Sequence, residues 1–160
     1  MKSETRQIGD HTYTVTMLPL SLWQQLRDAI WPTLMGVIPD IIDHGDAPTA
    51  EQLTDVVQSA SVLLPLQGEA YRAALKVLQA CSQVEGHPGY LSNIAELWWS
   101  DTGYAELGGW LAFALEVQFV PFLYGLPLAS LHRLAEAARS RSPLTLSGRS
   151  GGLSAGGMVP

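Results

Sequence analysis

The sequence predicts a mainly α fold: a small helical domain with an N-terminal β-hairpin and a flexible C-terminal tail. Residues 4–17 alternate polar and apolar side chains about a Gly9-Asp10 turn, whereas most later apolar residues recur at helical spacing. From residue 140 onward Gly and Ser dominate and apolar residues are few. We therefore expect a single domain over residues 1–139 and a flexible Gly/Ser-rich tail over residues 140–160.

The hairpin is predicted from the alternation that follows its turn. Glycine is the first residue of the two-residue turn Gly9-Asp10, and the threonines after it alternate with larger side chains. This period of two places Tyr13, Val15 and Met17 on one face. Because an isolated hairpin is only marginally stable in water, we expect that face to rest on helices.

The first helix is expected to begin at Ser21, which fits an N-cap with Gln24 at the capping-box position. The residue before a proline avoids the helical region, so Trp31-Pro32 should interrupt this helix. We expect the apolar residues 33–38 to continue it with a kink.

Three further helices are predicted up to residue 99. After a loop over residues 39–48, Thr49 should cap a helix that ends near Leu64. Residues 68–84 have the clearest amphipathic pattern and are expected to be helical throughout, and residues 90–99 should form a short helix.

An apolar helix rich in aromatic residues is predicted over residues 104–120, where Pro121 should end or kink it, and an Ala-rich helix should follow over residues 128–139. Aromatic side chains dominate cores and interfaces alike, so we interpret this stretch as core together with a surface for a partner. The residues expected to contact that partner are Trp98, Trp99, Trp110, Phe113, Phe119 and Phe122.

A membrane span is the main alternative for the aromatic helix, because roughly 20 apolar residues cross a bilayer. Glu116 and Gln118 near its middle argue against it, since a charged residue at a helix centre costs roughly 2.5–3.5 kcal/mol on insertion scales. Residues 1–6 are too polar for a signal peptide. We therefore expect no membrane association.

The composition limits the classes of partner. The net charge is −6 with nine Lys and Arg residues, which argues against nucleic acid and anionic membrane surfaces. Charged residues make up only 15% of the chain against a usual share of about 25%, so we expect apolar surface to be covered by a partner protein or a second copy. The single cysteine, Cys81, lies among apolar residues and suggests an inert core thiol in a reducing compartment.

No group of residues predicts catalysis or a cofactor. Asp40, Asp43, His44 and Asp46 match no calcium loop and supply one imidazole, so we expect a polar loop and no metal. The other histidines fit solvated or capping positions, and no serine lies in a Gly-x-Ser-x-Gly elbow. The glycine-rich run 148–152 lacks the lysine of a phosphate loop. We therefore expect a protein that is not an enzyme.

Two segments resemble one known family. Residues 8–19, IGDHTYTVTMLP, resemble the N-terminal hairpin and first-helix start of the tail assembly chaperones of long-tailed bacteriophages. Residues 104–119, YAELGGWLAFALEVQF, resemble the C-terminal helix of that family, which leads into a short aromatic segment like residues 119–122.

The resemblance implies a protein that binds the helical tape-measure protein, keeps it soluble and helps to recruit tail-tube subunits in the host cytoplasm. The expected partners are thus the tape-measure protein and, beyond it, the tail-tube protein or a second copy of the chain. Such a chaperone would be absent from the mature virion. The alternatives are a minor structural or adaptor protein of a phage virion, a small helical dimerising regulator, or an enzyme subunit completed by a partner.

Overall fold

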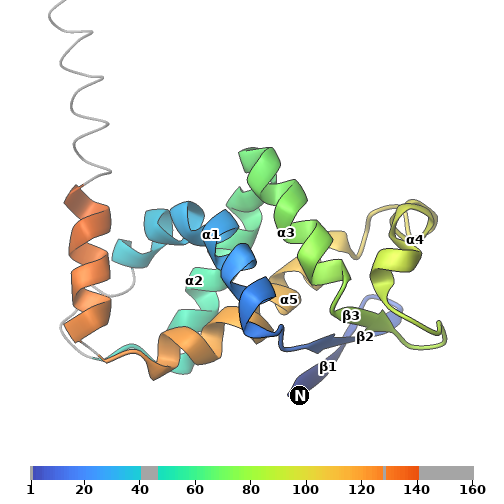
Figure 1. Cartoon of the computed structure of the whole chain (residues 1–160), viewed down its shortest axis with the longest axis horizontal. Coiled ribbons are helices and arrows are strands. Elements are labelled where there is room, and N and C mark those ends of the chain that lie inside the picture. Colours follow the sequence, from blue (N-terminus) through green and yellow to red (C-terminus); the bar gives the residue numbers. More distant parts are fainter. Residues whose placement is uncertain (1, 41–46, 128, 141–160) are drawn as a thin grey trace, which may run out of the picture.

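The computed structural model describes residues 2–40, 47–127 and 129–140. Helices surround one long helix, α5 (Leu107–Gly125), and a small antiparallel sheet lies beside them (Figure 1). The predicted fold class, mainly helical with an N-terminal hairpin, is confirmed. The expected tail beyond residue 140 and the loop residues Asp43, His44 and Asp46 lie outside the described residues.

The sheet contains the predicted hairpin and one further strand. Strands β1 (Ser3–Ile8) and β2 (His11–Thr16) pair about the Gly9-Asp10 turn, and β2 also pairs with β3 (Ser82–Val84) in the order β1-β2-β3. The expected continuous helix over residues 68–84 is therefore wrong at its end.

Helix α3 (Glu69–Gln79) stops five residues before the predicted boundary. The chain then adopts a period of two, with Ser82 and Val84 buried and Gln83 exposed. Val84 pairs with Tyr13 of β2, a residue far away in the sequence. The apolar side chains at positions 81 and 84 have helical spacing, and the pairing of Val84 with the distant Tyr13 overrides that local pattern.

Helix α1 (Leu20–Val37) begins one residue before the expected cap, and the one-turn helix η1 (Ile38–Asp40) follows it. Pro19, not Ser21, is the N-cap, and no side chain caps this end. Pro32 lies inside the helix without ending it. Ile30 and Leu34, one turn apart on either side of Pro32, are both buried, and this burial offsets the roughly 3 kcal/mol that an interior proline costs.

Helix α2 (Ala50–Leu63) begins as predicted. The Thr49 hydroxyl accepts a hydrogen bond from the Gln52 amide, and the Gln52 side chain accepts one from the Thr49 amide, which completes a capping box. The 3-10 turn η2 (Leu64–Gln67) then joins α2 to α3 at the predicted Pro65 boundary.

The predicted short helix over residues 90–99 is divided into η3 (Leu91–Asn93) and α4 (Ala95–Asp101). Helix α5 starts at Leu107 and continues through Pro121 to Gly125. The expected helix start near Tyr104 is therefore wrong, and of the two expected effects of Pro121 the helix end is excluded, while a kink stays a prediction. Phe119 and Leu123, one turn apart across Pro121, are fully buried. The predicted last helix is present over residues 129–140.

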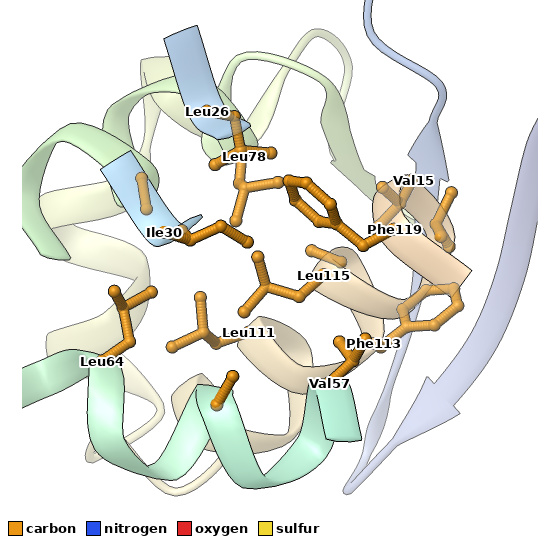
Figure 2. Close-up of a cluster of buried hydrophobic side chains, with 14 of the residues drawn as sticks. Val15, Leu26, Ile30, Val57, Leu64, Leu78, Leu111, Phe113, Leu115 and Phe119 are labelled. Atoms are coloured by element: carbon orange, nitrogen blue, oxygen red, sulfur yellow. The ribbon is translucent and has the colours of Figure 1, made fainter. Parts of the chain in front are cut away.

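The core is centred on α5, which contacts α2, α3, β1 and β2, while α1 packs against α2 and α3. Figure 2 shows side chains from all of these helices and from β2 converging on one cluster. The labelled members are Val15, Leu26, Ile30, Val57, Leu64, Leu78, Leu111, Phe113, Leu115 and Phe119.

Candidate functional site

The six aromatic residues expected to contact a partner are mostly core residues in this structure. Five are buried, and only Phe122 is partly exposed. The buried ones are Trp98, Trp99, Trp110, Phe113 and Phe119.

Each of the three buried tryptophans donates its indole N–H within the chain. Trp98 donates to the Tyr13 hydroxyl at 3.0 Å, Trp99 to Oε1 of Gln79 at 2.8 Å, and Trp110 to the Ser82 hydroxyl at 3.0 Å. These bonds join α4 and α5 to the sheet and to α3. A buried indole N–H needs a hydrogen-bond acceptor, so each of these bonds holds its tryptophan in one packing arrangement.

The phenylalanines are also engaged inside the chain. The guanidinium of Arg6 lies 4.5 Å from the centre of the Phe113 ring, and Trp23 of α1 packs against both Phe119 and Phe122. A partner could reach the buried aromatic residues only if the fold opened. The buried aromatic residues are therefore not part of the accessible surface. Partner contact by these six residues stays a prediction.

A polar junction connects the hairpin to the start of α5, and sequence reasoning missed it. Glu106 is only 7% exposed and precedes α5 directly. Its carboxylate accepts hydrogen bonds from the Tyr13 hydroxyl at 2.8 Å, from Nδ1 of His11 at 2.9 Å and from the Asp10 amide at 3.3 Å. The sequence gives one indication of this junction, an acidic residue immediately before an apolar helix. It does not indicate which residues bind Glu106, because they lie far away in the sequence.

Two opposing effects set the pKa of Glu106. Burial raises the pKa, whereas hydrogen bonds from His11, Tyr13 and the Asp10 amide lower it, and the net result is a pKa below the ordinary value. Burial raises the pKa of the Tyr13 hydroxyl, which therefore stays protonated and donates to the carboxylate. The junction therefore contains one carboxylate, and the hydrogen bonds to it hold the hairpin against the start of α5.

Two glycines allow this close approach. A Cβ on Gly9, whose φ is +60°, would lie 2.8 Å from Cγ of Glu106, and a Cβ on Gly109 would lie 2.8 Å from Cγ2 of Ile8. Both distances are too short for real Cβ atoms. The hairpin turn and the first turn of α5 are therefore in direct contact.

Glu116 and Gln118, the two residues that argued against a membrane span, bind the hairpin. Glu116 forms a 3.0 Å ion pair with Arg6 and accepts a 2.9 Å hydrogen bond from the amide of Gln58. Gln118 accepts from the Leu18 amide at 3.1 Å and donates to the Thr16 carbonyl at 2.9 Å. Helix α5 is long and apolar enough to cross a bilayer, but more than half of it is buried against the rest of the chain.

An accessible hollow with a largely apolar lining lies over the seam between α2 and α5. We call it the α2–α5 groove; its volume is about 450 Å³. It is lined by Gln58, Ser61, Val62, Pro65, Tyr71, Tyr104, Leu107, Gly108, Leu111 and Ala112.

The lining of the α2–α5 groove comes mostly from these two helices and from the residues next to them. Positions 58, 61 and 62 follow helical spacing along the end of α2, and positions 107, 108, 111 and 112 follow it along the start of α5. Pro65 lies in η2, and Tyr104 precedes α5. No lining residue carries a charge at neutral pH. Val62 is 74% exposed, and Leu66 beside the groove is 78% exposed. A groove between two helices with a largely apolar lining fits the apolar face of a third helix.

Tyr104 stands at the rim of the α2–α5 groove in an unusual conformation. Its φ is +61°, the one positive φ of a described non-glycine residue, and its side chain is 61% exposed. It also borders a second hollow, lined by residues that include Leu97 and Trp99. A left-handed conformation costs a residue with a side chain about 1–2 kcal/mol, and such strain clusters at functional positions. Sequence reasoning placed Tyr104 in a helix and missed this left-handed conformation.

In residues 2–40, 47–127 and 129–140, no three His, Cys, Asp or Glu side chains are close enough to bind a metal ion. Burial raises the pKa of the Cys81 thiol to about 11, as expected for an inert core thiol. His11 hydrogen-bonds Glu106, and His87 contacts the Trp98 ring edge-on at 4.8 Å.

Comparison of the chain with protein-family models, with curated proteins and with solved structures finds no match.

Proposed function

We propose that the protein is a tail assembly chaperone of a long-tailed phage, which binds an amphipathic helix of the tape-measure protein in the α2–α5 groove and keeps that protein soluble. The proposal starts from the resemblance of residues 8–19 and 104–119 to this family. It assigns the protein no catalytic step.

The packing of those two segments supports the proposal. Tyr13 from the first segment bonds Glu106 from the second, and Leu18 bonds Gln118. The two stretches that carry the resemblance are therefore in contact within one folded unit.

The observation that carries the proposal is the exposed Tyr104 at the rim of an uncharged apolar groove. Aromatic side chains are the strongest anchors at protein interfaces, and a helix binds a groove through apolar residues one turn apart. A tape-measure protein is long and helical and would offer many such faces. Binding in a shallow groove is also compatible with later release during tail assembly.

Gly108 provides a way to block the groove without disturbing the core. A Cβ added at Gly108 meets no atom within 4 Å, so leucine there would project into the groove and would also favour the helix. Gly36 in α1 has the same open surroundings and does not line the groove. Gly36→Leu is therefore the matched control for Gly108→Leu.

The test is co-expression with the tape-measure protein encoded beside this chain, followed by measurement of soluble tape-measure protein and its co-elution. We expect the wild type and Gly36→Leu to solubilise the partner and Gly108→Leu to fail. Equal solubilisation by all three would overturn the groove as the binding site. Failure of all three would overturn the chaperone proposal, and finding the chain in purified virions would favour the adaptor alternative instead.

A further inference from the structure

We propose that the free edge of β1 pairs with β1 of a second copy, so that two chains share one continuous six-stranded sheet. In the described chain, β1 is an edge strand of the sheet, and its first five residues are exposed. Figure 1 places β1 at the lower margin of the molecule. Exposed edges of this length are templates for pairing with another strand.

The register of the hairpin shows which backbone groups of β1 face outward. The Met17 amide donates to the Lys2 carbonyl, whereas the Thr16 amide donates to the Cys81 carbonyl and the Thr12 carbonyl accepts from the Glu85 amide. Odd-numbered residues of β2 thus bond β1, and even-numbered ones bond β3. Because hydrogen-bonded and non-hydrogen-bonded pairs alternate, the even-numbered residues of β1 bond β2. The N–H and C=O groups of Ser3, Thr5 and Gln7 are left facing outward.

These three outward-facing residues are self-complementary in an antiparallel pairing. With Thr5 opposite Thr5 of the second copy, Ser3 falls opposite Gln7 at both ends, so all three positions become hydrogen-bonded pairs. This is the two-fold arrangement that a symmetric dimer requires. The facing side chains on this side of the sheet are hydroxyls and amides, and none is charged.

Charge selects this register over its neighbours. With Thr5 opposite Thr5, Glu4 lies directly opposite Arg6 of the second copy, and this contact occurs twice. Shifting the pairing by two residues in either direction would place Glu4 opposite Glu4 or Arg6 opposite Arg6. Opposite charges across a strand pair stabilise it and like charges destabilise it.

Both charged side chains remain available for this contact. Glu4 is exposed and forms no ion pair among the described residues. The side chain of Arg6 is bound to Glu116 at one nitrogen but is still 48% exposed. The other sheet edge, β3, is only three residues long and contacts α3 and η3. The β1 edge is the longer and more accessible of the two, and it shares no residue with the α2–α5 groove.

The first test is sedimentation velocity of the wild type, Glu4→Lys and Glu85→Lys from micromolar to millimolar concentration. Glu85 is exposed beyond β3 and gives the same change of charge away from the β1 edge. We expect a reversible dimer for the wild type and for Glu85→Lys, and a dissociation constant raised about tenfold or more for Glu4→Lys. A wild type that stays monomeric throughout, or equal effects of the two substitutions, would overturn the proposal.

The second test addresses the register. Thr5 and Thr14 share a 2.8 Å hydrogen bond between their hydroxyls, so Thr5→Cys and Thr14→Cys lose the same contact in the folded chain. Only residue 5 lies on the proposed two-fold axis. A short bis-maleimide should link Thr5→Cys into dimers and leave Thr14→Cys monomeric, while equal linking of both would rule out this pairing.

Discussion

The hydroxyl of Tyr13 donates a 2.8 Å hydrogen bond to Oε1 of Glu106 across 93 positions of sequence. The same hydroxyl accepts the indole N–H of Trp98, so one side chain connects β2, α4 and the start of α5. Neutralising or removing Tyr13, Glu106 or Trp98 would leave buried polar atoms without hydrogen-bond partners. This loss costs more free energy than the hydrogen bonds themselves contribute. The junction is therefore expected to control the stability of the hairpin on the helices.

Replacing Glu106 tests this role at neutral pH. Glu106→Gln keeps the size of the side chain but places an amide donor among the donors of Tyr13, His11 and the Asp10 amide. We expect the free energy of unfolding, measured in urea, to fall by about 1–3 kcal/mol. Glu96→Gln, on the exposed side of α4, is the control and should stay within about 0.5 kcal/mol of the wild type. Equal behaviour of the two variants would contradict a buried ionic junction.

The pH dependence of stability follows from the lowered pKa of Glu106. The unfolded chain binds the proton near the ordinary pKa of 4.5, and the folded chain binds it only at lower pH. This carboxylate therefore contributes its full stabilisation above pH 4.5 and loses it as the pH falls through the folded pKa. The stability difference between wild type and Glu106→Gln should shrink on acidification below that value. A difference that stays constant would show that the carboxylate charge is not involved.

Gly9 and Gly86 separate the cost of a left-handed backbone from the cost of a clash. Both have positive φ, +60° and +89°, but only at Gly9 would a Cβ collide with another side chain, that of Glu106. Alanine at either position should cost about 1–2 kcal/mol from the backbone alone. Gly9→Ala should cost a further 1–3 kcal/mol, by order of magnitude, because the junction must shift. Thermal melts of both variants would measure the difference, and equal losses would refute the close packing of the turn on Glu106.

Trp110 should be the most costly aromatic residue to remove. It is fully buried, its ring packs 5.2 Å from that of Trp99, and its indole bonds Ser82. We expect Trp110→Ala to lower the free energy of unfolding by about 3–5 kcal/mol. Phe122→Ala is the comparison, because Phe122 is partly exposed and should cost less. An unchanged melting temperature for Trp110→Ala with loss of partner binding would instead make Trp110 an interface residue.

Elements that depend on neighbouring residues could be predicted from the sequence. The hairpin follows from alternation and the Gly9-Asp10 turn, and α2 follows from Thr49 and its amphipathic stripe. The ends of elements depend on distant contacts and were misplaced. Val84 joins a sheet because Tyr13 offers a pairing partner, and Pro121 stays helical because its flanking turns are in the core.

The candidate site was harder to predict from the sequence than the fold. Aromatic content correctly marked residues of the core, but content alone does not distinguish a buried ring from an exposed one. Trp98 and Trp99 face the core, and the neighbouring Tyr104 faces solvent, because the chain turns through two left-handed residues, Gly103 and Tyr104. No local pattern predicts a left-handed tyrosine, since glycine is the usual residue there.

Tyr104 offers the sharpest separation of stability from function. Its strained backbone conformation is one that glycine adopts freely, so Tyr104→Gly should leave the free energy of unfolding unchanged or raise it by up to about 1 kcal/mol. If the exposed ring anchors a helix in the α2–α5 groove, the same variant should lose solubilisation of the tape-measure protein. Tyr90→Ala removes another exposed tyrosine ring outside that groove and should retain it. A stable Tyr104→Gly variant that still solubilises the partner would show that the strain serves the turn between α4 and α5, and that the anchor lies elsewhere along the groove.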